Sequence, residues 1–529
     1  MNDIVILDLF DSKGYKQQVE IIQQDSDRVL IDLSKYFILT HKSCRKLNKI
    51  MFDEFCVSID PSLYLSLLKL ADKDIFECCR LLEIAKSYQD KNVNIVIKTE
   101  RESLVKEIYC LLKLDIKRVR VERVKSTRSV TKYAIGKLAK LSLLCINRFK
   151  VKKYKVKKVF FLYDNLVSFE YVRPYLKNGI TYPFLTEKNS YDNVCYDQDK
   201  FINHKFICHE LIPSSFYRFI DNRESILNSS IPITLKKLLI HYLVELEIQV
   251  LCFESLVIKF DSLKDIIGLF DAYPCIDYVT KVLNDKFGVM TTCIPHGINF
   301  KYKVHYISYG TNIYSFWSDD HKNRLDQSVI YDDTKNKIIT GNVLFEAISK
   351  DVKSRNVSER NILIVGEYFS KDGLYSSPFN ESHTRRMMSI LKKFALDNSD
   401  IKIKIRTRLN DEYSEICNDY KCENITIVSP DIPVEKEIIN SSLVISVFSN
   451  VLHEALIMRK PVLQVNMFGI ENYRDLAADG LVSYATNEKE LLLALKSWEE
   501  NSFKHVNYDF HEEKYCNRLV FNPIKSMVD

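Results

Sequence analysis

The sequence predicts an α/β protein made of two doubly wound, Rossmann-like domains with a cleft between them. Three observations support this fold class. The chain has 529 residues, more than one hydrophobic core usually serves. Short apolar runs alternate with longer stretches of helical periodicity, a pattern typical of parallel sheets covered by helices. A polar stretch without an apolar stripe, 347–360, divides these runs into two series.

The first series predicts a strand at each short apolar run and helices between the strands. Strands are expected at 4–10, 28–33, 92–98, 118–122, 157–165, 263–271 and 288–297. A helix is expected at 273–287. The long apolar run from Leu238 is interrupted by one histidine and three glutamates. We therefore interpret it as a buried amphipathic helix and not as a membrane span.

The second series predicts a further α/β unit. Its expected strands are 361–369, 401–409, 425–428, 443–448 and 460–466, with helices at 385–396 and 451–458. The resulting domain organisation is an N-terminal domain over 1–346, a linker at 347–360, a C-terminal domain over 361–500 and a tail at 501–529. We expect the tail to pack back on the N-terminal domain.

Charge is distributed unevenly along the chain. From Arg123 to Lys158 there are thirteen Lys or Arg residues and no acidic residue, although the whole chain has a net charge of only +6. Leu138, Leu141 and Phe149 lie at helical spacing within this segment. A basic amphipathic helix of this kind favours an anionic membrane surface as its partner. The alternative is a packed helix with a solvated basic face. Nucleic acid is not expected, because no known binding motif is present.

A candidate ligand site follows the expected strand 443–448. Ser449 and Asn450 form the turn before the next helix, and Glu454 lies one helical turn further on. Ligands of open α/β sheets bind at the carboxyl ends of strands, and a helix N-terminus favours an anion. Ser449 and Asn450 can donate to a phosphate, and Glu454 can accept hydrogen bonds from a ribose diol. The alternative is that Ser449 or Asn450 only caps the helix.

Two arginines follow another strand of the same unit. Arg406 and Arg408 are two residues apart in "KIRTRL", so they share one face of a strand. Two guanidinium groups at a strand end can clamp phosphate or carboxylate oxygens. A solvated strand end would explain either arginine alone.

The stretch "CIPHGIN" places His296 and Gly297 in a turn after an apolar run. Chemistry in α/β enzymes is commonly carried by such strand-end loops. The unperturbed pKa of an imidazole, about 6.5, suits a general base, so His296 could remove the proton from a sugar hydroxyl. It could instead hydrogen-bond a donor phosphate. The structural alternative is a histidine that satisfies a turn carbonyl. Asp271 and, with weaker support, Asp164 are carboxylates at other strand ends. Asp271 could act as base or nucleophile, or cap the following helix.

No metal or cofactor is expected. The 14 cysteines include no CxxC pair, and no run of His and Cys has zinc-ligand spacing. No paired-aspartate motif stands at a strand end. We therefore expect metal-independent chemistry, in which Arg406 and Arg408 would stabilise a leaving phosphate.

The order "PHG", "FWSDDHKNRL", "IITGNVLFE" and "SNVLHEALIMRKPVLQVN" resembles GT-B glycosyltransferases of bacterial surface polysaccharide (capsule and lipopolysaccharide) synthesis. Within this group the chain most resembles transferases that use CMP-ulosonic acids such as Kdo or sialic acids. The transferases that use CDP-glycerol share the histidine–glycine turn. The resemblance covers about 265–466. It implies that Glu454 binds the ribose and that Ser449 and Asn450 meet the phosphate. Where the family often has a His-Pro pair, this chain has Arg408 and Leu409, which leaves the donor open.

The resemblance implies a cytoplasmic glycosyltransferase, peripheral at the inner face of the membrane. Its expected partners are a nucleotide sugar donor bound by 361–500, with Gly297 also in the donor-binding set, a glycan acceptor on the 1–346 side, and an anionic membrane surface through 123–158. Two other classes stay open. A sugar-nucleotide 2-epimerase shares the fold, although its usual His-Pro-Arg-Thr stretch is missing here. A non-catalytic glycan-binding scaffold is the other.

Overall fold

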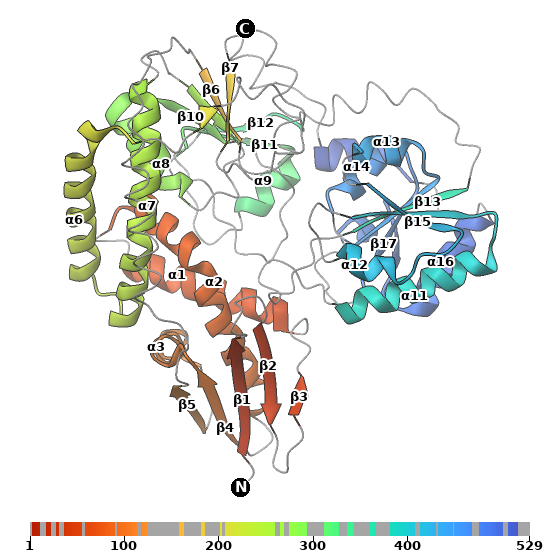
Figure 1. Cartoon of the computed structure of the whole chain (residues 1–529), viewed down its shortest axis with the longest axis horizontal. Coiled ribbons are helices and arrows are strands. Elements are labelled where there is room, and N and C mark those ends of the chain that lie inside the picture. The colour runs from red at the N-terminus through yellow and green to blue at the C-terminus, as the bar shows by residue number, and fades with distance from the viewer. Residues whose placement is uncertain are drawn as a thin grey trace.

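A computed structural model gives the fold (Figure 1). It describes residues 3–10, 17–22, 28–30, 36–55, 59–89, 93–123 except 115 and 117, 158–162, 181–185, 202–203, 207–259, 265–268, 275–293, 311–326, 336–342, 360–366, 381–407, 413–429, 432–467 except 448, 475–500 and 506–516. Strands in these ranges form three sheets, of five, seven and six strands. The expected α/β class is confirmed, and the six-stranded sheet with its helices forms a body of its own at the right of Figure 1.

The five-stranded sheet has the order β3-β2-β1-β4-β5. Its strands are β1 (Asp3–Phe10), β2 (Gln17–Ile22), β3 (Arg28–Leu30), β4 (Asn94–Thr99) and β5 (Val119–Arg123). Strands β1, β4 and β5 are parallel, as expected. The expectation of a parallel sheet is wrong for the other two pairs, because β2 pairs antiparallel with β1 on one side and with β3 on the other. A short polar connection joins β1 to β2, and such a connection permits only a hairpin.

Three helices cover this sheet, namely α1 (Phe37–Phe55), α2 (Pro61–Lys86) and α3 (Glu102–Leu112). Helix α2 begins at a capping residue, Asp60, whose Oδ1 accepts from the backbone N–H of Ser62 at 2.9 Å. Most of α2 is buried, since it packs against β1 and β4 and also against α7 and α8. It therefore joins the first sheet to the second, and one hydrophobic cluster extends from Ile4 to Phe316.

All neighbouring pairs of the seven-stranded sheet are parallel, in the order β12-β11-β10-β9-β6-β7-β8. Its strands are β6 (Lys158–Leu162), β7 (Thr181–Leu185), β8 (Ile202–Asn203), β9 (Asp265–Gly268), β10 (Met290–Cys293), β11 (Ile313–Phe316) and β12 (Asn336–Ile339). Counted along the chain, the first six follow the Rossmann order 3-2-1-4-5-6. The chain reverses direction across the sheet between β6 and β9, which is therefore its topological switch point.

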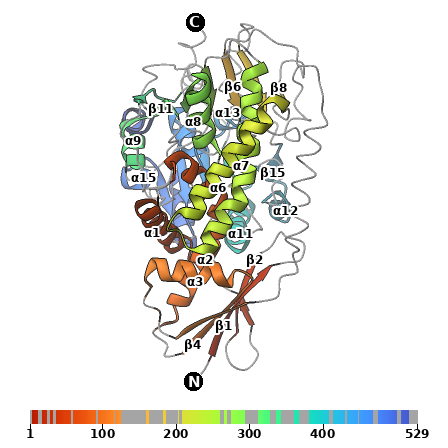
Figure 2. The ribbon, with the colours of Figure 1, turned by 90° about the vertical axis from the view of Figure 1, so that its left-hand side faces the viewer.

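Helices α6 (Ile212–Asn228), α7 (Ile233–Lys259) and α8 (Ile276–Phe287) belong to this part, with the short η5 (His209–Leu211) before α6 and α9 (Asp319–Asp326) after β11. The buried amphipathic helix expected from Leu238 is confirmed as α7. In Figure 2, α6 and α7 run side by side along the molecule, and the five-stranded sheet lies at the end that carries the N-terminus.

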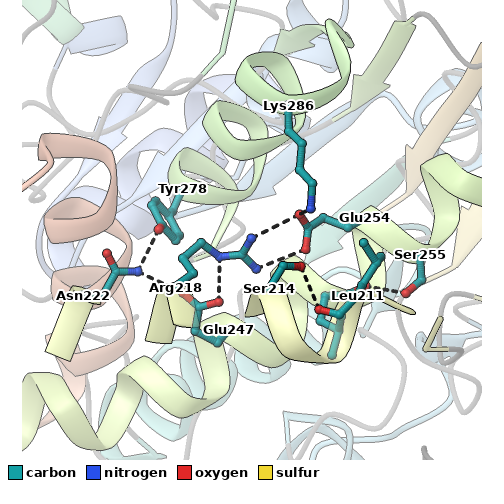
Figure 3. A network of polar contacts seen from close by, with 10 residues as sticks. Leu211, Ser214, Arg218, Asn222, Glu247, Glu254, Ser255, Tyr278 and Lys286 are labelled. Carbon is teal, nitrogen blue, oxygen red and sulfur yellow. Dashed lines mark hydrogen bonds and ion pairs between the residues drawn. The ribbon is translucent and has the colours of Figure 1, made fainter. Parts of the chain in front are cut away.

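A polar network joins α6, α7 and α8 (Figure 3). The guanidinium of Arg218 donates to Glu247 at 2.9 Å and, through two nitrogens, to Glu254 at 3.1 Å. Lys286 donates to Glu254 at 2.8 Å. Asn222 bridges Glu247 and the hydroxyl of Tyr278. These glutamates interrupt the apolar run of α7 without making it solvent-exposed, because cations from its neighbours compensate them.

The six-stranded sheet is also fully parallel, in the order β15-β14-β13-β16-β17-β18. Its strands are β13 (Asn361–Val365), β14 (Lys402–Arg406), β15 (Ile425–Val428), β16 (Leu443–Ser446), β17 (Val462–Val465) and β18 (Ser483–Ala485). This is again the Rossmann order 3-2-1-4-5-6, with its switch point between β13 and β16. Strands β13, β16 and β17 are buried along their length, as strands covered on both faces should be.

The helices of this domain are α11 (Glu381–Asp397), α12 (Tyr413–Asn418), α13 (Val434–Ile439), α14 (Val451–Ile457), α15 (Asp475–Ala478) and α16 (Glu488–Glu499). Two short elements follow, α17 (Tyr508–His511) and the π-helical turn η8 (Glu512–Cys516). Both lie near α14 or α9: α17 packs on α14, and η8 packs on α9. The expected return of the tail 501–529 to the N-terminal domain stays a prediction for the tail as a whole. The expected linker 347–360 lies outside the described residues, apart from its last position.

Candidate functional site

The candidate site lies at the switch point of the six-stranded sheet, where β13 and β16 end side by side. Two hydrogen bonds fix these strand ends. The hydroxyl of Ser446 donates to the carbonyl of Val365 at 2.9 Å, and the N–H of Gly366 donates to the carbonyl of Arg406 at 2.9 Å. The ends of β14, β13 and β16 are thus held in one row. Open α/β sheets bind their ligands in the crevice at such a row.

Ser449 and Asn450 lie in the turn between β16 and α14, and both are half-buried. Asn450 is the N-cap residue, but its side chain makes no capping hydrogen bond. Among the described residues, the hydroxyl of Ser449 accepts a long hydrogen bond, 3.4 Å, from the N–H of Val451. The capping alternative is therefore weak for either side chain. Helix α14 has only seven residues, so an anion here would depend on side chains more than on a helix dipole.

Glu454 projects from the first turn of α14. Its Oε2 atom is buried and has no hydrogen-bond partner among the described residues. Burial, followed by the nearby carboxylate of Glu435, raises the pKa of Glu454 to about 8, while the guanidinium of Arg406 acts in the opposite direction. A buried acidic group that is still without a partner can accept hydrogen bonds from a ligand.

Arg406 ends β14 and is half-buried. One of its guanidinium nitrogens donates to the carbonyl of Ile432, which lies between β15 and α13. The guanidinium is close enough to Glu454 to lower its pKa. The structure therefore places Arg406 and Glu454, which were predicted separately from two stretches of sequence, within electrostatic reach of each other.

One contributor to the electrostatics was not found from the sequence. Helix α13 carries Glu435, which acts on Glu454, and Glu437, which pairs with Lys404 of β14 at 3.0 Å. The acidic and apolar alternation of this short helix was visible in the sequence. The strand order that places α13 beside α14 was not.

Several predicted residues lie outside the described residues, and their roles stay predictions. They are Arg408 after β14, Asp164 after β6, Asp271 after β9, and His296 and Gly297 after β10. The strands that precede the last four are neighbours in the seven-stranded sheet, where Phe161 pairs with Gly268 and Gly268 with Cys293. These residues therefore follow adjacent strand ends at the switch point of that sheet.

The membrane prediction is not tested by the fold. Most of the basic segment, 124–157, lies outside the described residues. Within the part of the chain that the structure covers, no helix combines the length and the apolar character that crossing a bilayer requires.

No protein-family model matches the chain, and no curated protein sequence matches it. Solved structures of similar fold include the S. aureus MnaA–UDP co-structure, with 10% identity, a TM-score of 0.42 and coverage of 68% of this chain and 92% of that one. UDP-GlcNAc 2-epimerase from Neisseria meningitidis bound to UDP-GlcNAc has 11% identity and a TM-score of 0.43, with coverage of 70% of this chain and 98% of that one. The wall teichoic acid polymerase TagF has 11% identity and a TM-score of 0.43, with coverage of 76% of this chain and 97% of that one. A likeness of this size assigns no activity, so function must be argued from the chain's own residues.

Proposed function

We propose that the chain is a glycosyltransferase of the GT-B type that moves a sugar from a nucleotide-activated donor to a lipid-linked or growing surface glycan. The observation that supports this proposal is the juxtaposition of Arg406 and Glu454 at the switch point of a Rossmann sheet. A nucleoside diphosphate sugar or a CMP-sugar has both a ribose diol and phosphate oxygens. The carboxyl group of Glu454 offers an acceptor for the diol, and the guanidinium of Arg406 offers a donor for the phosphate.

In this proposal each group has one role. Glu454 accepts hydrogen bonds from the two ribose hydroxyls, and Ser449 and Asn450 donate to the phosphate. Arg406, together with Arg408, neutralises the charge that develops on the leaving phosphate, a role that needs no metal ion. A second guanidinium also suits the carboxylate of an acidic sugar, so we favour a CMP-linked acidic sugar as donor.

The acceptor side of the reaction is assigned to the turn after β10. His296 would remove the proton from the acceptor hydroxyl as that oxygen attacks the anomeric carbon. The bond from the anomeric carbon to the phosphate oxygen breaks in the same step, and the phosphate takes the electron pair. Asp271, which follows the neighbouring strand, is the alternative base. Gly297 belongs to the same turn as His296 and would contact the donor.

The basic segment 123–158 would hold the enzyme on an anionic membrane, at the inner face, where a lipid-linked acceptor is presented. Each Lys or Arg near anionic lipid contributes about 1 kcal/mol of attraction. Thirteen such residues without an acidic one support this proposal.

A thermal-shift screen of nucleotides and nucleotide sugars, followed by titration calorimetry, tests the proposed function. We expect stabilisation by CMP and CMP-sugars that exceeds stabilisation by UDP. A shift with UDP alone would still support a nucleotide sugar donor, but it would indicate a UDP-linked sugar in place of the CMP-linked one. Conversion of UDP-GlcNAc to its C2 epimer without an acceptor would instead indicate the epimerase. No shift with any nucleotide would refute the donor site and favour the glycan-binding scaffold.

A further inference from the structure

The side of α14 that carries His453 holds a second group of chemically reactive side chains. His453 comes from α14, His511 ends α17, and Cys516 ends η8. All three side chains are buried, and one ligand atom of each lies within 4.8 Å of those of the other two. The three residues thus converge from three elements, two of which belong to the C-terminal segment.

The two histidines face each other directly. Nδ1 of His453 lies 2.9 Å from Nε2 of His511, and the rings are stacked with centroids 5.2 Å apart. The other nitrogen of His511, Nδ1, is buried and has no hydrogen-bond partner among the described residues. One proton between the rings satisfies this contact, and it makes no use of the thiol of Cys516, which completes a group of three possible ligand atoms within 4.8 Å of one another.

We propose that His453, His511 and Cys516 bind a zinc ion that fixes the C-terminal segment to α14. Imidazole nitrogen and thiolate sulfur are the ligands that Zn²⁺ prefers. Tetrahedral coordination at ordinary zinc–ligand lengths puts two nitrogens about 3.3 Å apart and a nitrogen and a sulfur about 3.6 Å apart. These separations fall between the 2.9 Å of the two ring nitrogens and the 4.8 Å limit of the group. For zinc binding the two nitrogens must separate by about 0.4 Å, and the rings must turn so that both lone pairs point at the metal.

Zinc binding changes the protonation of the site in a defined way. The thiol of Cys516 loses its proton to solvent and becomes the thiolate ligand. The ring proton that joined the two histidines moves, by exchange with solvent, to the other nitrogen of its own ring. Both rings stay neutral, and each facing nitrogen can then bind zinc. Three protein ligands leave one coordination position, which a water molecule can fill.

The residues around His511 and Cys516 make packing and ion-pair contacts, which suit a metal site that stabilises the structure. Tyr515, stacked on His511, donates its hydroxyl to Asp479, and Lys514 pairs with the same carboxylate at 2.7 Å. Tyr515 and Cys516 belong to one hydrophobic cluster with Trp317, which precedes α9. A metal ion at this point would therefore hold the last described segment of the chain against both α14 and the end of the seven-stranded sheet.

The first test is the metal content of the full-length protein, purified without chelator, loaded with ZnCl₂ and passed through gel filtration. We expect about one zinc ion per chain by elemental analysis. Cys516→Ser and His511→Ala should lower the bound zinc at least about tenfold. Cys422→Ser is the matched control, because Cys422 is a free cysteine in the same domain, and it should keep the zinc. Equal zinc in Cys516→Ser and Cys422→Ser would overturn the proposal.

A second measurement avoids variants, which is useful if either substitution prevents folding. Chelator-treated wild-type protein is titrated with Co²⁺, and its absorption spectrum is recorded. Thiolate ligation gives a sulfur-to-cobalt charge-transfer band, and tetrahedral coordination gives strong ligand-field bands. Loss of both bands on adding Zn²⁺ would show that the two ions share the site. Wild-type protein that binds neither ion in stoichiometric amount would show that the group is a hydrogen-bonded histidine pair, and the proposal would fail.

Discussion

Replacing Glu454 by alanine should weaken nucleotide binding at least about tenfold. In the unliganded protein Oε2 of Glu454 is buried and has no partner among the described residues, so a bound ribose would supply its hydrogen bonds. A hydrogen bond to a charged group contributes about 1.5–3 kcal/mol, and water in the vacated space recovers part of that when the side chain is removed. A net loss of at least about 1.4 kcal/mol follows, which is a factor of ten in the dissociation constant.

Titration calorimetry is run at a pH above about 8, the value to which burial raises the pKa of Glu454, so that this group is charged. The ligand is the nucleotide that stabilises the wild-type protein most. Glu454→Gln should fall between wild type and Glu454→Ala, because the amide keeps one acceptor oxygen but loses the charge. Glu488→Ala is the control, since Glu488 is an exposed glutamate of the same domain and its removal makes the same change in net charge.

Alanine is compatible with the helix at this position, so Glu454→Ala should stay folded. An unchanged dissociation constant in folded Glu454→Ala protein would refute the ribose assignment. Equal weakening in Glu454→Ala and Glu488→Ala would show that only long-range charge matters, and that result would also contradict a direct contact.

His296→Ala should lower turnover by roughly 10²–10⁴-fold with little change in donor affinity, and Asp271→Ala measured beside it identifies which of the two is the base. Full activity of folded His296→Ala protein would leave this histidine a structural role. Neutralising the six lysines of 150–158 should release the protein from anionic vesicles while activity on a soluble acceptor persists; wild type that fails to float with such vesicles at low salt would contradict the membrane role. Arg218→Ala should reduce stability by about 3–5 kcal/mol, because the buried Glu247 loses its guanidinium partner and the buried Glu254 keeps Lys286 but loses the two-nitrogen contact with Arg218. The exposed pair of Arg385 should contribute less than about 1 kcal/mol, so equal thermal shifts for the two alanine variants would refute this reasoning.

The strands could be predicted where they are continuous apolar runs. Apolar runs such as 361–369 and 443–448 became β13 and β16, which are buried on both faces. The hairpin strand β2 was missed, since "QQVEII" has only three apolar residues and gives no clear period. Strands β11 and β12 were missed because neither is a continuous apolar run: "IYSF" contains a serine, and "NKII" has only two apolar residues. Long-range pairing decides such segments, and local propensity does not.

The candidate site could be predicted in its parts and not in its assembly. Glu454 and Arg406 each had a local reason, namely a position after a strand end. Their mutual proximity depends on the order of the strands, which places β14 and β16 on either side of β13. No pattern in a single sequence states that order. The same limit explains why ligand spacing gave no indication of the group His453, His511 and Cys516, because His453 lies 58 residues before His511 in the chain.

Helix α14 links the two inferences physically. His453 and Glu454 are successive residues, and successive side chains on an α-helix point about 100° apart, so one helix can serve two separate sites. A helix of seven residues has little stability of its own and depends on packing for its position. The buried contacts of His453 with His511 and Tyr515 supply that packing on one side, and Glu454 is thereby held toward the end of β14 on another. The two proposals still fail independently, because nucleotide affinity is a property of the Glu454 side and bound zinc is a property of the His453 side.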